Sequence, residues 1–255
     1  MISKLFINGV KLRERGEGYV FSLPAVRHLS QLSFSSPVSF LVGENGTGKS
    51  TLLEAIAVNS GFNPEGGSRD FRFSTSDTHS ELADHITVVK GIRRPTDGFF
   101  LRAESFYNVA SEVEQLAGSG LAGDSEAAMQ SFYEGSYGGK SLHRQSHGES
   151  FLSLVLHRFR GNGLYLLDEP EAALSPTRQM TLLARIHEMA KNGSQFIIAT
   201  HAPILMSLPG ADVFVLDEEG ISCIPYKETE HYAVTKLFLD DPDRMLHELL
   251  GEPDR

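Results

Sequence analysis

Residues 38–50 read VSFLVGENGTGKS, an apolar run that passes directly into a loop rich in glycine. The loop, from Gly43 to Ser50, matches the pattern G-x-x-x-x-G-K-[ST] at every fixed position. The residues that follow, 50–58, place their apolar side chains at helical spacing. The sequence therefore predicts a buried strand, a tight loop and a helix in direct succession.

Each residue type in this loop suits the binding of a nucleotide phosphate. Glycines let the backbone curl so that successive N–H groups point at phosphate oxygens, and the helix that follows adds the positive end of its dipole. Lys49 is expected to reach the β- and γ-phosphates, and the Ser50 hydroxyl to take a position on Mg²⁺. A purely structural glycine turn is the alternative, and the flanking strand and helix make it the weaker one. The predicted nucleotide-binding residues are Gly43, Glu44, Asn45, Gly46, Thr47, Gly48, Lys49, Ser50 and Thr51.

A second apolar run, residues 164–167, ends in two carboxylates, Asp168 and Glu169. Such a pair at a strand end is by itself usually a turn. Beside a glycine loop, however, Asp168 is expected to hold Mg²⁺ directly or through water. Glu169 would then polarise an attacking water as a general base.

Two further motifs stand in a fixed order around these carboxylates. The run Ser146, His147, Gly148 and Glu149 precedes an apolar helix, and His201 follows an apolar strand at 195–200. Taken alone, the first is a helix cap and the second a structural histidine. The order of all four motifs along the chain favours a functional interpretation.

This order resembles the ABC ATPase superfamily, with its Walker A loop, S-x-G-E signature, L-L-D-E-P strand and A-T-H switch, and it covers essentially the whole chain. The stretches GENGTGKST and ATHAPIL resemble more closely the soluble non-transporter branch of SMC, RecF and OLD-like proteins, the bacterial AAA family ATPases. The resemblance implies an α/β P-loop NTPase fold of ABC type. We expect a mostly parallel sheet flanked by helices, an N-terminal antiparallel β portion and a small helical lobe that carries the signature. It further implies a single domain over residues 1–255, with an inserted helical or irregular lobe at 61–149 that ends in the signature.

The resemblance also implies how the motifs work together. ABC proteins bind two ATP molecules between two subunits arranged head to tail, so the signature residues 146–149 would contact the nucleotide held by the glycine loop of a second copy. Glu169 would activate water and His201 would sense or hold the γ-phosphate. ATP would then hold the dimer together and its hydrolysis would release it. The expected substrate is ATP, the cofactor Mg²⁺, and the partners a second copy and an unidentified protein.

Some positions depart from the usual ABC pattern. His147 stands where glycine is common, and Ser175 where aspartate is frequent. The glutamine that usually contacts Mg²⁺ has no obvious counterpart, and Glu104, after the apolar run at 98–102, is the candidate to replace it. Tyr19 and Phe21 are candidates for stacking on adenine, although a core position suits Phe21 better.

Composition limits the class of protein. A chain of 255 residues with 40% apolar residues suits one large globular domain. Cys223 is the only cysteine, which excludes an intramolecular disulfide and favours a cytoplasmic location. No apolar stretch approaches the roughly 20 residues that cross a bilayer, so direct membrane insertion is not expected.

The charge balance does not indicate a nucleic-acid partner, because the net charge is −10. Nucleic acid stays possible only through a local basic patch. Five arginines, at 69, 72, 93, 94 and 102, could form one, although scattered surface arginines are the simpler interpretation.

The pattern of apolar residues predicts most of the regular elements. Strands are expected at 4–8, 19–23, 38–42, 86–92, 98–102, 164–167, 195–200 and 213–216. Helices are expected at 50–58, 103–116, 151–159 and 176–191, the last with Ser175 as its N-cap and Pro176 at its first position. No heptad run predicts a coiled-coil arm.

Three functions are compatible with these motifs. The preferred hypothesis is a soluble ATPase whose head-to-tail dimer drives a conformational switch for DNA maintenance, defence or regulation. The ATP-binding subunit of a membrane ABC transporter is one alternative. A regulatory module that hydrolyses ATP slowly is the other.

Overall fold

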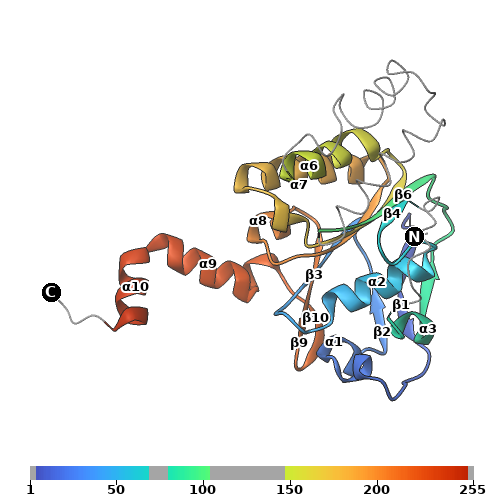
Figure 1. Cartoon of the computed structure of the whole chain (residues 1–255), viewed down its shortest axis with the longest axis horizontal. Coiled ribbons are helices and arrows are strands. Elements are labelled where there is room, and N and C mark those ends of the chain that lie inside the picture. The colour runs from blue at the N-terminus through green and yellow to red at the C-terminus, as the bar shows by residue number, and fades with distance from the viewer. Residues whose placement is uncertain (1–3, 69–79, 104–146, 252–255) are drawn as a thin grey trace.

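The computed structural model describes residues 4–68, 80–103 and 147–251. Its main sheet has seven strands in the order β10-β9-β3-β8-β7-β6-β4. The five central strands run parallel to their neighbours, and the two edge strands are antiparallel. The predicted mostly parallel sheet is therefore confirmed (Figure 1). Its strands are β3 (Val38–Val42), β4 (Gly67–Ser68), β6 (Asp97–Arg102), β7 (Gly163–Asp168), β8 (Gln195–Ala199), β9 (Asp212–Asp217) and β10 (Gly220–Cys223).

A second, antiparallel sheet has three strands in the order β2-β1-β5. These are β1 (Ile7–Leu12), β2 (Gln31–Ser33) and β5 (Ile86–Lys90). The sheet confirms the expected antiparallel portion near the N-terminus, to which β5 adds a strand from later in the chain. The Gln195 side chain joins it to the main sheet, since its Oε1 accepts the N–H groups of Phe6 and Ile7 at 2.8 and 2.9 Å.

The main sheet is buried on both faces because residues alternate between two apolar cores. In β3, Phe40 and Val42 belong to one core, whereas Leu41 belongs to the other. The first core is completed by α6 (His147–Arg158), α7 (Pro176–Lys191) and α8 (Pro203–Met206). The second is completed by α1 (Pro24–Arg27), α2 (Lys49–Asn59), α3 (Leu82–His85) and the antiparallel sheet. Figure 1 shows α2 on the opposite side of the sheet from α6 and α7.

The start of α7 agrees with its predicted cap. The Ser175 hydroxyl accepts the Arg178 N–H at 3.4 Å, and Pro176 occupies the first position, where no N–H is needed. The helix ends at Lys191, as the sequence predicts.

Other boundaries differ from the sequence predictions. The strand expected at 19–23 is wrong, because Tyr19–Ser22 forms the 3-10 helix η1 and leads into α1 at Pro24. The first strand begins three residues later than the start of the predicted range and runs to Leu12. The start of α6 lies at His147, so Gly148 and Glu149 belong to its first turn. The helix expected at 103–116 lies almost wholly outside the described residues.

Residues 80–103 of the expected insertion contribute β5 to the antiparallel sheet and β6 to the main sheet. The remainder of that segment includes 69–79 and 104–146, which the structure does not describe. The described part of the expected insertion therefore belongs largely to the body of the molecule.

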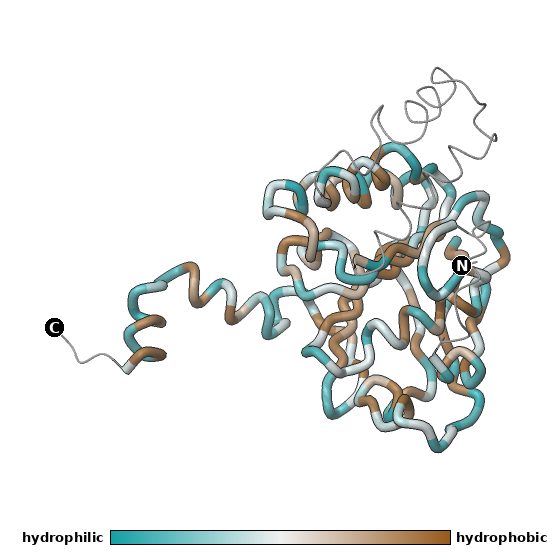
Figure 2. Tube along the Cα trace, in the orientation of Figure 1, coloured by the Kyte–Doolittle hydropathy of each residue, from teal (hydrophilic) through white to brown (hydrophobic). Residues whose placement is uncertain are grey.

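The chain ends in two helices that leave this body, α9 (Glu230–Asp240) and α10 (Pro242–Leu250), which we call the C-terminal arm (Figure 1). Neither helix has a buried residue, and hydrophobic residues recur along both (Figure 2). The most exposed of them are Leu239, Leu249 and Leu250, at 71, 71 and 68%. Of the helices in the described segments, none has the length and apolar character to cross a lipid bilayer.

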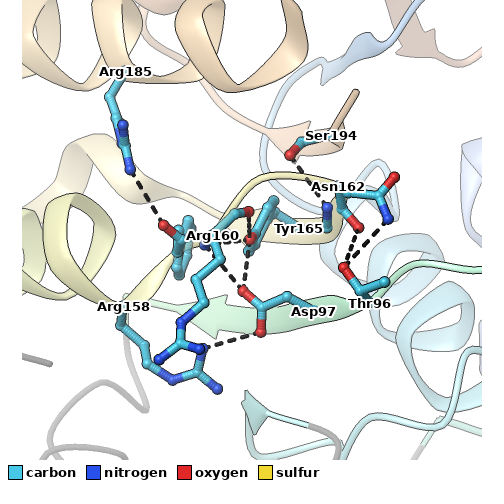
Figure 3. A network of polar contacts seen from close by, with 10 residues as sticks. Thr96, Asp97, Arg158, Arg160, Asn162, Tyr165, Arg185 and Ser194 are labelled. Carbon is cyan, nitrogen blue, oxygen red and sulfur yellow. Dashed lines mark hydrogen bonds and ion pairs between the residues drawn. The ribbon is translucent and has the colours of Figure 1, made fainter. Parts of the chain in front are cut away.

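A polar network lies at the amino ends of the central strands (Figure 3). Asp97, at the start of β6, accepts a hydrogen bond from the Tyr165 hydroxyl at 2.7 Å and pairs with Arg158 at 3.0 Å. The Tyr165 ring stacks between Phe159 and Phe196. This network fixes β6, β7 and α6 to one another at the end of the sheet opposite the carboxyl ends of the strands.

Candidate functional site

The glycine loop joins β3 to α2 at the carboxyl edge of the main sheet. Gly43, Gly46 and Gly48 have φ values of 154, 83 and 99°, which residues with a Cβ atom rarely adopt. A Cβ on Gly43 would lie 2.2 Å from the Leu216 carbonyl oxygen, so glycine is needed there for space as well. The loop therefore has the curled backbone that its sequence predicts.

Lys49, the first residue of α2, folds over this loop. Its Nζ donates to the carbonyl oxygens of Gly43 at 2.7 Å and Glu44 at 2.9 Å. Burial lowers the pKa of Lys49, while the nearby carboxylates of Glu169 and Asp168 act in the opposite direction. The ammonium group is therefore held against the first two carbonyl oxygens of the loop.

Ser50 and Asp168 meet although they are far apart in sequence. The Ser50 hydroxyl donates to Asp168 Oδ1 at 2.9 Å. The parallel pairing of β7 between β6 and β8 brings the end of β7 to the same edge of the sheet as the loop. Two of the three predicted metal-binding residues therefore place their side-chain oxygen atoms together.

Arg102, the last residue of β6, lies beside this cluster. Its guanidinium is 3.5 Å from Asp168 Oδ2 and 3.0 Å from Glu54 Oε2. A small cavity of about 150 Å³ is lined by Ser50, Arg102, Ala103, Asp168 and Glu169. Arg102 thus adds a positive charge at the edge of the cavity, which the sequence did not assign to the site.

Glu169 has a left-handed backbone, with φ 49° and ψ 50°. Its N–H donates to the Ala199 carbonyl at 2.9 Å, which holds the end of β7 against β8. Its Oε1 lies 3.7 Å from His201 Nε2, and the two side chains are 43 and 29% exposed. The predicted catalytic residues are therefore neighbours at an open edge.

Glu171 fixes the backbone of His201. It lies in the short 3-10 helix η3 (Pro170–Ala173), and its Oε1 accepts the His201 N–H at 2.5 Å. Burial raises the pKa of Glu171, whereas burial lowers the pKa of His201, helped by the charge of Lys49. His201 is therefore neutral at pH 7 and carries a single ring proton.

A second histidine lies behind the first. His201 Nδ1 and His231 Nε2 are 3.3 Å apart. His231 belongs to the first turn of α9 and also lines a larger cleft of about 520 Å³. Residues 43–47 and 215–218 form much of the wall of this cleft, together with Glu228 and Glu230. Its volume is in the range of small-molecule sites.

The signature residues are described in part. Gly148 packs against η3, since a Cβ on it would lie 2.2 Å from the Ala173 carbonyl oxygen. Glu149 pairs with Arg178 at 3.0 Å. Ser146, the His147 side chain and Glu104 lie outside the described residues, so their assignments stay predictions.

The two aromatic candidates have different surroundings. Phe21 is buried and meets the His85 ring edge-to-face at 4.8 Å, which fits a core position. Tyr19 is 79% exposed.

The five arginines do not all belong to one described patch. Arg102 belongs to the site, while Arg93 lies over the Phe6 ring before β6 begins. Arg69 and Arg72 lie outside the described residues.

Sequence reasoning missed Arg102, Glu171 and His231. Arg102 is the last residue of the predicted strand at 98–102. Its place at a strand end, like that of Asp168, is a signal that the sequence offers. The other two act through contacts that depend on how distant segments pack.

A glycine loop between a central parallel strand and a helix, facing an acidic strand end, defines the class of P-loop nucleoside triphosphatases. The comparisons with known proteins agree with this class. Residues 21–119 match the family described as "AAA domain", and residues 148–207 match "AAA domain, putative AbiEii toxin, Type IV TA system". No curated protein matches the chain.

The fold is that of ABC-type P-loop ATPases. It is similar to a nucleotide-free ATP-binding cassette from an ABC transporter, with a TM-score of 0.52 and 17% identity over 93% of this chain and 96% of that chain. It is also similar to a putative metal-chelate type ABC transporter in an inward-facing conformation, with a TM-score of 0.51 and 16% identity over 92% of this chain and 89% of that chain. The SMC head domain from Thermotoga maritima aligns with a TM-score of 0.43 and 15% identity, over 87% of this chain and 99% of that chain.

Proposed function

We propose that the chain binds ATP with Mg²⁺ at its glycine loop and hydrolyses it in a head-to-tail dimer. The dimer forms and separates as a switch for a soluble partner system in DNA maintenance, defence or regulation. The hydrogen bond of 2.9 Å between Ser50 and Asp168 carries this proposal, because it joins the loop to the acidic strand end.

The oxygen atoms present suit Mg²⁺. This ion is usually held by one or two protein ligands, waters and substrate phosphates. Ser50 Oγ and Asp168 Oδ1 supply two such atoms, and no group of three His, Cys, Asp or Glu side chains forms a further metal site in the described ranges. Bound there, Mg²⁺ would neutralise charge on the β- and γ-phosphates.

Hydrolysis then requires a base and a means of holding the γ-phosphate. Glu169 takes a proton from water as the water oxygen bonds to the γ-phosphorus and the bond to the bridging oxygen breaks. ADP leaves with that electron pair, and Lys49 and the loop N–H groups stabilise the charge. His201, beside Glu169, holds a γ-phosphate oxygen through a ring N–H.

Exposure of the catalytic pair supports a second copy as the other half of the site. The Glu169 and His201 side chains are 43 and 29% exposed in one copy, although His201 Nε2 itself is buried. A surface that excludes water would strengthen their interactions. We propose that the signature of a second copy, Ser146 to Glu149, supplies this surface.

A family match and the C-terminal arm bear on the partner system. The description matched by residues 148–207 names a putative toxin of a type IV toxin–antitoxin system, which supports a defence role over transport. The exposed C-terminal arm offers a surface for a protein partner.

Replacing Glu169 by Gln tests the proposed hydrolysis. E169Q removes the base and keeps the size of the side chain, so we expect turnover to fall at least about 100-fold while ATP binding persists. ATP should then accumulate dimers, measured by light scattering after size exclusion. Turnover equal to that of the unaltered protein would exclude Glu169 as the base.

The same background tests the head-to-tail arrangement. S146R places a bulky cation in the proposed interface, so the double variant S146R/E169Q should bind ATP as a monomer. A dimer of the double variant with ATP would contradict the proposed contact. Slow hydrolysis by the unaltered protein, with intact ATP-dependent dimers, would favour a regulatory module.

A further inference from the structure

The structure places a second imidazole directly behind the proposed γ-phosphate sensor. His201 Nδ1 lies 3.3 Å from His231 Nε2, and the ring centroids are 5.5 Å apart. On its other side, His201 Nε2 lies 3.7 Å from Glu169 Oε1. His201 is therefore held between a histidine and the proposed general base.

This geometry matters because a neutral imidazole carries only one proton. Whichever group meets one ring nitrogen decides whether the proton lies on the other. Only a proton on Nε2 lets His201 donate towards the Glu169 side of the site. A proton on Nδ1 would leave Nε2 as an acceptor, which repels a phosphate oxygen.

We propose that His231 is a positioning residue that donates from its Nε2–H to His201 Nδ1 and so keeps the His201 proton on Nε2. The inference rests on the proposed function, since it gives His201 its expected task. His231 itself does not touch the reacting atoms.

The start of α9 holds His231 in place. Thr229 caps this helix, accepting the Tyr232 N–H at 3.3 Å and donating to the Tyr226 carbonyl at 2.8 Å. Thr229 is only 1% exposed, so the cap is anchored in the body although the rest of α9 is not. Glu228 and Glu230 line the same cleft as His231.

The first experiment compares two changes at this position. H231F keeps a planar ring but removes the donor, and we expect kcat to fall about 10-fold or more, the usual effect of losing a partner that orients a histidine. H231Q keeps an N–H donor at the place of Nε2 and should retain most of kcat. The KM for ATP and the Tm should stay close to those of the unaltered protein in both.

A matched control is the same exchange at His187. This residue lies in the last turns of α7, which leads to the amino end of β8, whereas the site lies at the carboxyl ends of the strands. H187F should leave kcat unchanged. Equal losses of kcat in H231F and H187F would overturn the inference.

A double-mutant cycle tests whether His231 acts through His201. In an H201A background there is no ring to orient, so adding H231F should cause no further loss of kcat. Losses that multiply in the double variant would assign His231 a separate role and overturn the proposal.

A measurement on the nucleotide-free protein reads the proton position directly. ¹⁵N spectra of labelled histidine should show His201 protonated on Nε2 in the unaltered protein and in H231Q, but not uniformly in H231F. The signal is assigned by its loss in H201A. Protonation on Nδ1 in the unaltered protein would overturn the inference.

The proposed function and this inference fail in different ways. If E169Q hydrolyses ATP at the unaltered rate, the proposed base is wrong, whatever His231 does. If E169Q is slow but H231F turns over normally, hydrolysis at Glu169 stands and only the role of His231 falls.

Discussion

At the scale of single residues, Asp97 shows how one carboxylate supports the sheet from the end opposite the site. Burial tends to raise the pKa of Asp97, but hydrogen bonds from Tyr165 and Arg158 and the charge of Arg158 outweigh it, so the pKa lies below its ordinary value. Because the folded pKa is depressed, the carboxylate stabilises the fold above the unfolded pKa of about 3.9. That stabilisation is lost as the pH falls through the folded value.

D97N should therefore destabilise the protein in a pH-dependent way. We expect the free energy of unfolding at pH 7 to fall by about 1–3 kcal/mol, because a charged partner of Arg158 and Tyr165 is lost. The difference should shrink at pH 3, as measured by urea unfolding. Five residues of extended strand, about 16 Å, separate Asp97 from the end of β6, so ATP turnover at pH 7 should not change. A difference in stability that is the same at both pH values would contradict this account.

Individual site residues were predictable where a local motif dictates them. The conformation of Gly43 to Gly48 and the meeting of Ser50 with Asp168 follow from the loop and from parallel strands that end at one edge. His231 was not predictable, because its contact with His201 joins segments that only the packing of α9 brings together. The role of Ser146 stays a prediction.

At the scale of elements, apolar runs predicted the central strands well, because a strand buried on both faces has no polar side. The failure at 19–23 has a physical cause. Residues 19–23 form a short apolar-rich run as in a strand, but Pro24 has a fixed φ and lacks an N–H, which suits the first turn of a helix. The arm was not predicted, because its apolar residues cover no core.

The contact between α6 and η3 gives a prediction about the signature helix. G148A would place a Cβ 2.2 Å from the Ala173 carbonyl oxygen, a backbone atom that no change of rotamer can move away. We expect a loss of about 1–3 kcal/mol in the free energy of unfolding and slower ATP turnover, because η3 directly follows Glu169. Nucleotide binding, measured by fluorescence titration, should persist.

Gly161 provides the matched control. A Cβ there would meet only the Asn192 carbonyl oxygen at 3.8 Å, an ordinary contact. G161A should therefore leave turnover and stability close to those of the unaltered protein. Normal turnover in G148A would show that α6 and η3 do not need their close contact.

At the scale of the whole molecule, we expect the C-terminal arm to contribute little to the free energy of folding of the body. Because α10 buries no residue, a chain that ends at Asp240 should have a Tm within about 2 °C of the full chain. It keeps Thr229 and His231, so turnover per protomer should be unchanged.

Removing α10 also removes the exposed Leu246, Leu249 and Leu250. We therefore expect less self-association at high protein concentration, measured by static light scattering without nucleotide. A fall in Tm of more than about 5 °C would show that α10 packs on the body in solution.

The left-handed backbone at Glu169 has a consequence for attempts to improve this protein. A residue with a long side chain costs about 1–2 kcal/mol in that conformation, whereas asparagine accepts it more readily. Directed evolution that rewards heat resistance alone would therefore favour loss of the proposed catalytic carboxylate at this position. Selection for thermal stability should therefore be combined with a screen for phosphate release, so that the selected variants keep the proposed ATPase activity.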